Sequence, residues 1–227
     1  TVSIVIPTLG RAAQLAACLD SIAATVRTPH EVICVTIATD GPTQRLLEQR
    51  PGVVNLVDQD RAGFVRAANR GFKAARGDWV AHLNDDCRLM PHAIDNAFFQ
   101  SSLPTSGDVG QLAFFHDSPV RRNVWQEVTV EGVRYVVTHV RGVLFANFGL
   151  TRRHVLEDVG FFDERFVMYG ADPDLSLKIW FDSGTRVEAC PGALVRHIEL
   201  DDERGREERA GQHRDNARLF EKWGLVP

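Results

Sequence analysis

Short apolar strands alternate with helical segments over the first eighty-odd residues, and this alternation constrains the fold more than any other feature of the chain. Apolar side chains recur at helical spacing over 15–26 and 65–75. The expected strands cover residues 3–6, 32–37, 53–57 and 79–83. Strands separated by helices of this length pair in parallel, with each helix crossing over one face of the sheet. The sequence therefore predicts an α/β fold with a mostly parallel central sheet flanked by helices.

The pattern changes beyond residue 86. Pro91 suits the first turn of a helix. Two β-rich runs flank Glu131-Gly132 and predict an antiparallel hairpin, although this dipeptide does not fix the turn type. Thr151 is expected to cap a helix that runs to residue 159, and further helices are expected over 175–181 and 207–223. There is no internal repeat and no low-complexity linker. We expect a single domain over 1–227.

Composition excludes two classes of protein. The chain has 227 residues, 26 of them Lys or Arg and 30 Asp or Glu, so its formal net charge is −4, and its pI is about 6.1. A sequence-independent nucleic-acid binder carries a strongly basic surface, and a disordered chain has a lower apolar content than the 44% found here. We expect a packed core and no nucleic-acid partner.

The cysteines and the apolar runs indicate a cellular compartment. Cys18, Cys34, Cys87 and Cys190 are scattered without a Cys-x-x-Cys pair, which favours reduced thiols in a cytoplasmic protein. No run has the length of a membrane span, and the N-terminus lacks the order of a signal peptide. The chain begins at Thr1 without methionine, which is compatible with trimming from a longer protein.

Polar residues follow three of the expected strands. Thr8 comes after the first strand, Asp40 after the second, and Asp85 and Asp86 after the fourth. Ligands of open parallel sheets bind beyond these carboxyl ends, so the four side chains are expected to converge. Adjacent carboxylates repel unless a cation offsets their charge, which a divalent ion bound with a diphosphate would do. The alternative is that Asp85 and Asp86 only cap a turn.

A series of short motifs carries a resemblance to a known family. The motifs are Ser-Ile-Val-Ile-Pro-Thr at 3–8 and the segments 39–43, 63–71, 75–78, 83–86, 159–166, 172–175 with Lys178, 196–197 and 222–224. In order and spacing they resemble family 2 glycosyltransferases, which have the GT-A fold. The resemblance implies a Rossmann-like sheet, a nucleotide-sugar-binding half over 1–100, and a smaller mixed-strand half over 101–227 that holds the acceptor and the catalytic base. The stretch 101–140 matches nothing specific.

The resemblance assigns the donor side of the site. It implies that Asp40 binds the nucleotide base, and a carboxylate there suits the imide N–H of uracil or thymine, so a UDP or dTDP sugar is expected. Thr8 would line the same pocket, and Asp85 would bind the ribose or the sugar. The alternative for Asp40 is the first position of an Asp-Gly turn.

The same resemblance implies a metal ion, Mn²⁺ or Mg²⁺. Asp86, in the family's Asp-x-Asp region, and the late His197 would bind it, because imidazole can accompany carboxylate and phosphate oxygens on Mn²⁺. Asn84 stands where many relatives have a further Asp, which removes one negative charge. Taken without the resemblance, His197 would be a structural or surface histidine.

An inverting sugar transfer also needs a base that reaches the acceptor hydroxyl. Asp172 matches the aspartate of the family's Glu-Asp motif and is the candidate. Ala171 replaces the preceding Glu, so whatever that Glu contributes must come from elsewhere. Asp174 could compete for the role, but its position at a helix start favours a capping residue.

Two further features have both structural and functional interpretations. The segment 201–215 is dense in both signs of charge, which is typical of a solvated helix face, and the alternative is a lid whose Arg204 binds the donor diphosphate. Trp125 could stack on a sugar, whereas Trp180 and Trp223 lie on apolar helix faces and are expected in the core.

The sequence therefore predicts an inverting, metal-dependent hexosyl- or deoxyhexosyl-transferase of polysaccharide or glycoconjugate biosynthesis. The acceptor would be a hydroxyl of a saccharide, a lipid-linked glycan or a small molecule. Peripheral association with the inner face of the membrane is compatible with this function, and the oligomeric state stays open. The alternatives are a non-catalytic sugar-nucleotide or glycan-binding domain and a nucleotidyltransferase. A dinucleotide oxidoreductase is disfavoured because no Gly-x-Gly-x-x-Gly follows the first strand.

Overall fold

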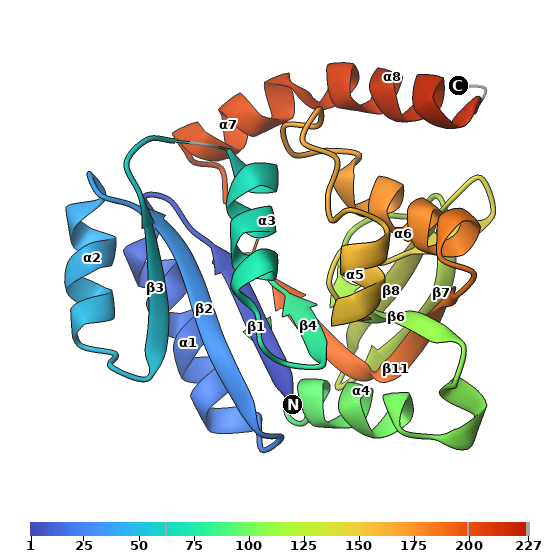
Figure 1. The fold of residues 1–227 in the computed structure, drawn as a ribbon, viewed down its shortest axis with the longest axis horizontal. Helices are drawn as coiled ribbons and strands as arrows, with labels where there is room; N and C mark the ends of the chain where they lie inside the picture. Colours follow the sequence, from blue (N-terminus) through green and yellow to red (C-terminus); the bar gives the residue numbers. More distant parts are fainter. Residues whose placement is uncertain (62, 199, 226–227) are drawn as a thin grey trace.

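The computed structural model describes residues 1–61, 63–198 and 200–225. In these residues the strands form one continuous sheet in the order β3-β2-β1-β4-β10-β6-β11-β5, and β7, β8 and β9 extend it from β6 (Figure 1). The strands are β1 (Val2–Pro7), β2 (His30–Ile37), β3 (Val53–Asp58), β4 (Trp79–His82), β5 (Cys87–Leu89), β6 (Val109–Asp117), β7 (Val124–Val130), β8 (Val133–Val140), β9 (Val143–Phe145), β10 (Gly149–Arg152) and β11 (Arg186–His197). The helices are α1 (Ala12–Thr25), α2 (Gly41–Glu48), α3 (Phe64–Ala74), α4 (Ala93–Ser101), α5 (Arg153–Asp158), α6 (Ala171–Asp182), α7 (Glu203–Ala210) and α8 (Gln212–Trp223), with a 3-10 turn at Pro104–Ser106.

The N-terminal half confirms the predicted parallel sheet. β3, β2, β1 and β4 pair in parallel, and the helices between them cover both faces. α1 packs Leu15 and Ile22 into the core on one face, while α3 packs Phe72 into the core on the other. A Cβ at Gly71 would lie 2.3 Å from Val5 Cγ1, so the close approach of α3 to β1 requires glycine there.

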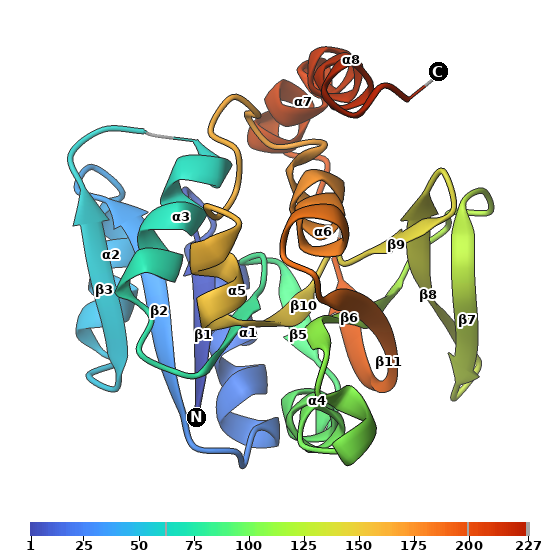
Figure 2. The same ribbon diagram turned by 45° about the vertical axis from the view of Figure 1, so that its right-hand side comes forward.

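The C-terminal half consists of mixed strands, as expected. β10 runs antiparallel to both β4 and β6, and β11 runs parallel to β6 and antiparallel to β5. The predicted hairpin is present as β7 and β8, which lie to the right in Figure 2, away from the parallel strands. Glu131 and Gly132 both have positive φ, at 50° and 77°, which is the signature of a type I′ turn.

Three local predictions were wrong at their boundaries, and one strand was not predicted. Thr151 lies in β10, where its Oγ1 accepts a hydrogen bond from Gln111 Nε2 at 3.0 Å, and it caps no helix. α6 begins at residue 171 instead of 175, so Asp172 lies in its first turn. The predicted helix over 207–223 is two helices separated at Gly211. β6 was not predicted, because both of its faces are buried and its residues therefore do not alternate between apolar and polar.

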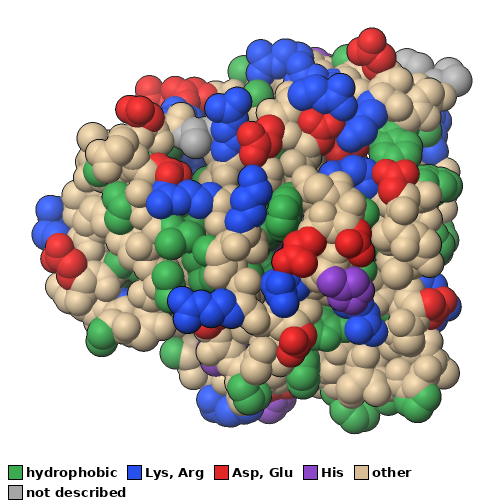
Figure 3. Space-filling view, in the orientation of Figure 1, with side chains coloured by type: hydrophobic (Ala, Val, Ile, Leu, Met, Phe, Trp, Pro, Cys, Tyr) green, Lys and Arg blue, Asp and Glu red, His purple; other side chains and the backbone are tan. Residues whose placement is uncertain are grey.

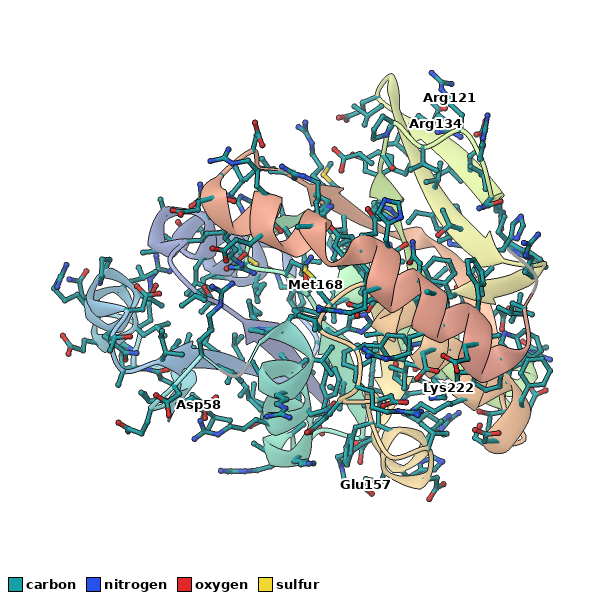
Figure 4. All side chains as sticks on the ribbon, turned by 90° about the horizontal axis from the view of Figure 1, so that it is seen from above. Asp58, Arg121, Arg134, Glu157, Met168 and Lys222 are labelled. Carbon is teal, nitrogen blue, oxygen red and sulfur yellow. The ribbon has the colours of Figure 1, made fainter. Side chains whose placement is uncertain are left out.

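The helices α7 and α8 cross the carboxyl edge of the sheet (Figures 1 and 4). Asp174, expected to cap α6, instead ties α8 down. Its carboxylate lies 2.7 Å from Lys222 Nζ and accepts a hydrogen bond from Trp223 Nε1 at 2.8 Å. Asp215 Oδ2 accepts the backbone N–H groups of residues 167 and 168 at 3.1 and 3.0 Å. These contacts hold α8 against the segment that precedes α6.

The predictions for the tryptophans hold in part. Trp223 is partly buried and packs against the core, but Trp180 is 37% exposed because it lies at the solvent end of α6. Trp125 is 50% exposed on β7, and a groove of about 470 Å³ separates it from Trp180. A sugar-stacking role for Trp125 stays a prediction.

The surface in Figure 3 shows Lys and Arg interleaved with Asp and Glu, so this face carries no field of a single sign. Within the described part of the chain, every helix is too short or too polar to span a bilayer.

Candidate active site

The loops after β1 and β4 meet at the carboxyl edge of the sheet, as the sequence predicts. Thr8 Oγ1 donates a hydrogen bond to Asp85 Oδ2 at 2.9 Å, although 77 residues separate the two. β1 and β4 are adjacent parallel strands, and this pairing brings their ends together. Both side chains are buried.

A buried arginine joins this carboxylate cluster. Arg11 Nη1 donates to Asp86 Oδ2 at 2.9 Å and lies 3.5 Å from Asp85 Oδ1. Its Nε and Nη2 donate to the two oxygens of Asp202, at 2.8 and 2.9 Å. These hydrogen bonds hold the pKa of Asp202 well below its usual range. Arg11 therefore links the donor-side carboxylates to the segment that leads into α7.

Arg204, from the first turn of α7, reaches the same cluster. Its Nη1 donates to Asp85 Oδ2 at 2.8 Å and to the backbone carbonyl of Leu9 at 3.0 Å. Arg204 therefore lies beside the predicted donor-side residue Asp85, as the lid interpretation of this segment predicts. Its guanidinium faces a carboxylate in this structure, and its binding to a diphosphate stays a prediction.

Asp86 and His197 lie together as the expected metal ligands should. Asp86 Oδ1 is 3.2 Å from His197 Nε2, and the His197 ring packs edge-on to Phe148 with centroids 5.2 Å apart. Burial opposes ionisation of Asp86, but His197, Arg11 and Arg204 outweigh it and hold the Asp86 pKa below its ordinary value. The carboxylate is therefore ionised and able to bind a cation.

A carboxylate oxygen and an imidazole nitrogen this close together are a donor pair that suits Mn²⁺ or Mg²⁺ with phosphate oxygens. Among the described residues no cluster of three or more His, Cys, Asp or Glu side chains is arranged to hold an ion. Metal binding by Asp86 and His197 stays a prediction.

Asp172 lies in the first turn of α6, beside the end of β4. Its Oδ1 is buried and is 3.8 Å from His82 Nε2, and its carboxylate hydrogen bonds the Asn147 side chain. Burial raises the pKa of Asp172 to about 8. The hydrogen bond from Asn147 lowers this pKa, but it offsets only part of the effect of burial. A carboxylate with a raised pKa is a strong base once it is ionised.

Asp40 has a structural role here. Its Oδ2 accepts the Gly10 N–H at 2.7 Å and its Oδ1 accepts the Thr43 N–H at 3.3 Å, so it caps α2 and fixes the loop after β1. The turn-forming alternative from the sequence is therefore present in the structure. Binding of a nucleotide base by Asp40 stays a prediction.

A cleft of about 380 Å³ opens beside this cluster, between the ends of the parallel strands, α3 and α7. Figure 4 looks down on this edge, with Asp58 at the end of β3 and Met168 near the middle of the view. The side chains and backbone that line the cleft belong to Pro7, Thr8, Leu9, Val35, Thr36, Ile37, Asp58, Arg61, Gly63, Phe64, Ala67, Val167, Met168, Arg204 and Glu207. Arg61 and Glu207 form an ion pair of 2.9 Å that joins the loop before α3 to α7. The cleft has the size of a small-molecule site and touches two predicted donor residues, Thr8 and Arg204.

The family of the chain is established by comparison. The model of glycosyl transferase family 2 matches residues 3–159, more than half of the sequence, and the chain belongs to this family. The membership agrees with the glycosyltransferase interpretation of the motifs and not with a nucleotidyltransferase.

Two curated relatives are similar in sequence. The O-antigen biosynthesis protein RfbC of Myxococcus xanthus is 30% identical over 204 residues, which are 78% of this chain and 16% of RfbC. The uncharacterized glycosyltransferase YwdF of Bacillus subtilis strain 168 is 26% identical over 229 residues, which cover 99% of this chain and 84% of YwdF. The chain thus spans about one sixth of RfbC and most of YwdF.

Solved structures confirm the GT-A fold. The mannosyltransferase PcManGT from Pyrobaculum calidifontis, in complex with GDP-Man and Mn²⁺, has a TM-score of 0.69 and 20% identity, covering 97% of this chain and 64% of PcManGT. Residues 1–349 of S. aureus TarS, in complex with UDP-GlcNAc, have a TM-score of 0.68 and 17% identity, covering 91% of this chain and 60% of the TarS chain. The fold class predicted from the sequence is therefore right.

Three residues in contact with the predicted site residues were not predicted from the sequence: Arg11, His82 and Asn147. Arg11 carried a usable signal, since it follows the first strand by four residues and its loop was already assigned to the site edge. His82 also had a signal, because an ionisable residue inside an apolar strand requires a buried partner. Asn147 had none, since the site residues that it contacts, His82 and Asp172, lie on other segments of the chain.

Proposed function

We propose that this chain transfers a sugar, with inversion, from a nucleoside diphosphate to a hydroxyl group of a saccharide, lipid-linked or small-molecule acceptor. The observation that carries the proposal is the arrangement around the end of β4. Residues 85 and 86 build the charged cluster beside the cleft, and three residues earlier His82 contacts Asp172. One short segment thus lies between the donor side and the candidate base.

The donor is proposed to lie in the 380 Å³ cleft, with Thr8, Asp85 and Arg204 around its ribose and diphosphate. PcManGT was solved with GDP-Man and TarS with UDP-GlcNAc, and these neighbours support a sugar nucleotide as the ligand class. We propose a UDP or dTDP sugar, with Asp40 as the residue that contacts the base. The contacts of Asp40 with Gly10 and Thr43 would keep it at the edge of the nucleotide site.

A divalent cation, Mn²⁺ or Mg²⁺, is proposed to bind Asp86 and His197. When bound, it would neutralise charge on the leaving diphosphate. Arg11 holds Asp86 Oδ2 in this structure, whereas Asp86 Oδ1 faces His197. The cation would therefore have to share Asp86 with Arg11 or displace it.

Asp172 is the proposed base. The acceptor hydroxyl gives its proton to the Asp172 carboxylate while its oxygen forms a bond to the anomeric carbon. The bond from that carbon to the diphosphate oxygen breaks, and its electron pair leaves with the nucleoside diphosphate. Because burial raises the pKa of Asp172 to about 8, we expect the rate to rise with pH through the neutral range.

The test is donor turnover by the intact chain and two variants. Nucleoside diphosphates of uracil, thymine and guanine, and their sugars, are screened by thermal shift with and without Mn²⁺, and the sugars that bind are assayed for transfer. We expect Asp86→Ala to lose the Mn²⁺-dependent shift and Asp172→Asn to keep it, with turnover reduced at least about 10²-fold in both. Full turnover in both variants would refute the assignment.

The absence of Glu before Asp172 and the raised Asp172 pKa favour one alternative, a sugar-nucleotide-binding domain without catalysis. It predicts Mn²⁺-dependent binding with no transfer by the wild-type chain at any pH from 6 to 9. The enzyme hypothesis predicts transfer that is strongest at the alkaline end of that range.

A further inference from the structure

His82, the last residue of β4, is buried and held in one orientation. It is 4% exposed and packs edge-on against two aromatic rings. The centroid of Phe72 lies 6.3 Å away at 80°, and that of Phe162 lies 6.0 Å away at 86°. These two rings fix the plane of the imidazole, so its nitrogens point in set directions.

The hydrogen bond of His82 identifies the nitrogen that carries its proton. Nε2 lies 3.0 Å from the backbone carbonyl oxygen of Asn147, and a carbonyl oxygen only accepts. Burial lowers the pKa of His82 to about 4, so the ring is neutral near pH 7 with its hydrogen on Nε2. That same N–H lies beside the carboxylate of Asp172, with Nε2 3.8 Å from Oδ1.

The two oxygens of Asp172 have different surroundings. Oδ1 is buried and has no hydrogen-bond partner among the described residues. The Asn147 side chain also bonds this carboxylate, and Asn147 Oδ1 accepts from Thr138 Oγ1 at 3.2 Å, so the Asn147 amide N–H faces Asp172. The side chain of Asp172 is 23% exposed, and this exposed part excludes Oδ1. An acceptor would therefore approach from the side away from His82.

We propose that His82 is a positioning residue for Asp172: when Asp172 ionises, its Oδ1 moves closer to the fixed Nε2–H, which the Asn147 carbonyl and Oδ1 then share. The role rests on the proposed function, in which the ionised Asp172 removes the acceptor proton. It supplies a partner for the base in a chain where Ala171 stands in place of the expected Glu. The acceptor proton ends on Asp172, and His82 keeps its own proton throughout.

Around Asp172, His82 is the titratable side chain in contact with its Oδ1. Asp174, on the same helix, points instead to Lys222 and Trp223 of α8. The side chain that faces Asp172 from the β9–β10 loop is the uncharged Asn147. The rings that enclose His82 from α3 and from the segment before α6 are uncharged as well. A polar hydrogen at the position of His82 Nε2 is therefore the main stabilising contact open to Oδ1.

Two amide substitutions separate the N–H contact from packing. In His82→Gln the amide nitrogen takes the place of Nε2, whereas in His82→Asn it takes the place of Nδ1 and cannot reach Oδ1. We expect His82→Asn to lower kcat at pH 7 about tenfold or more and to move the acid limb of the pH profile up by about one unit, with the donor KM unchanged. His82→Gln should stay within about threefold of the wild type, since it keeps the N–H.

The pKa of Asp172 is also measured directly, by ¹³C NMR of aspartate-labelled protein without substrate, with Asp172→Asn for assignment. The proposal predicts a higher Asp172 pKa in His82→Asn than in His82→Gln. The proposal would be overturned if the Asp172 pKa changed equally in both variants, or if it were the same in His82→Asn as in the wild type. A wild-type kcat and pH profile in His82→Asn would also overturn it. His82→Phe keeps the ring packing without an N–H, so its kcat and Asp172 pKa must change as in His82→Asn. It replaces His82→Asn in both measurements if that variant does not fold.

The two readouts distinguish this proposal from the proposed function. If the wild-type chain transfers sugar but His82→Asn is unimpaired, the role of His82 is wrong and the function stands. If no donor is turned over, the proposed function and the catalytic use of His82 both fail, whatever the NMR titration shows.

Discussion

Replacing Asp172 by Asn should make the protein more stable at neutral and alkaline pH. Burial raises the pKa of Asp172 from 3.8 to about 8 in the folded chain. Between these values the folded state keeps a proton that the unfolded state has lost, so the free energy of unfolding of the wild type falls as pH rises. The stabilising effect of the protonated carboxyl is complete below pH 3.8 and is gone above pH 8. The amide in the Asp172→Asn variant does not ionise, so the variant lacks this decline.

The size of the effect follows from the shift. From pH 5 to pH 8 the folded and unfolded states differ by at most one bound proton, so the free energy of unfolding falls by up to about 1.36 kcal/mol for each of these three pH units, or about 4 kcal/mol in all. A domain of ordinary stability has about 5 to 15 kcal/mol in total, so this change is easily measured. The gain in stability on removing an ionisable group is the expected signature of a carboxyl placed for chemistry and not for folding.

The assay is urea denaturation of both proteins at pH 5, 6, 7 and 8. The difference in the free energy of unfolding between Asp172→Asn and wild type should grow steadily with pH. Asp182→Asn, at the exposed end of the same helix, serves as the control and should follow the wild-type curve. Parallel curves for Asp172→Asn and wild type would show that the carboxyl is ionised in the folded protein near neutral pH, against the reasoning from burial.

Two further predictions concern buried polar contacts. Arg11→Met removes the cation that Asp86 Oδ2 contacts at 2.9 Å, so without Mn²⁺ the free energy of unfolding should fall by about 3 kcal/mol. Added Mn²⁺ should restore much of that loss and should bind the variant more tightly than the wild type in calorimetry, and an unchanged Mn²⁺ affinity would contradict competition between the two cations. Asn69→Leu leaves the Phe162 N–H and C=O without the side chain that bonds both at 2.9 Å. It should lower the free energy of unfolding by about 2 to 4 kcal/mol in urea denaturation, and a change below about 1 kcal/mol would mean that water replaces both bonds.

The donor half of the protein could be predicted from sequence because its signals are local. Each strand of this half is a short apolar run with a polar residue within two positions of its end, and the intervening helices show their buried faces by periodicity. Parallel pairing of β1 with β4 then follows from the alternation, and with it the meeting of Thr8 and Asp85. The motif order identified the family for the same reason, since the motifs follow the strand ends.

The sequence alone therefore determined the α/β class, the edge of the sheet that carries the site, and the candidate base and metal ligands. The tertiary structure decided which groups surround them. Arg11 bonds Asp202 across 191 residues, and His82 meets Asp172 only because the antiparallel β10 brings the Asn147 loop and α6 to the end of β4. The periodicity of apolar residues shows which face of a helix or strand is buried, but it does not show which residues pack against that face. The charge and protonation of a buried carboxyl depend on those partners, so they are set only when the whole chain is packed.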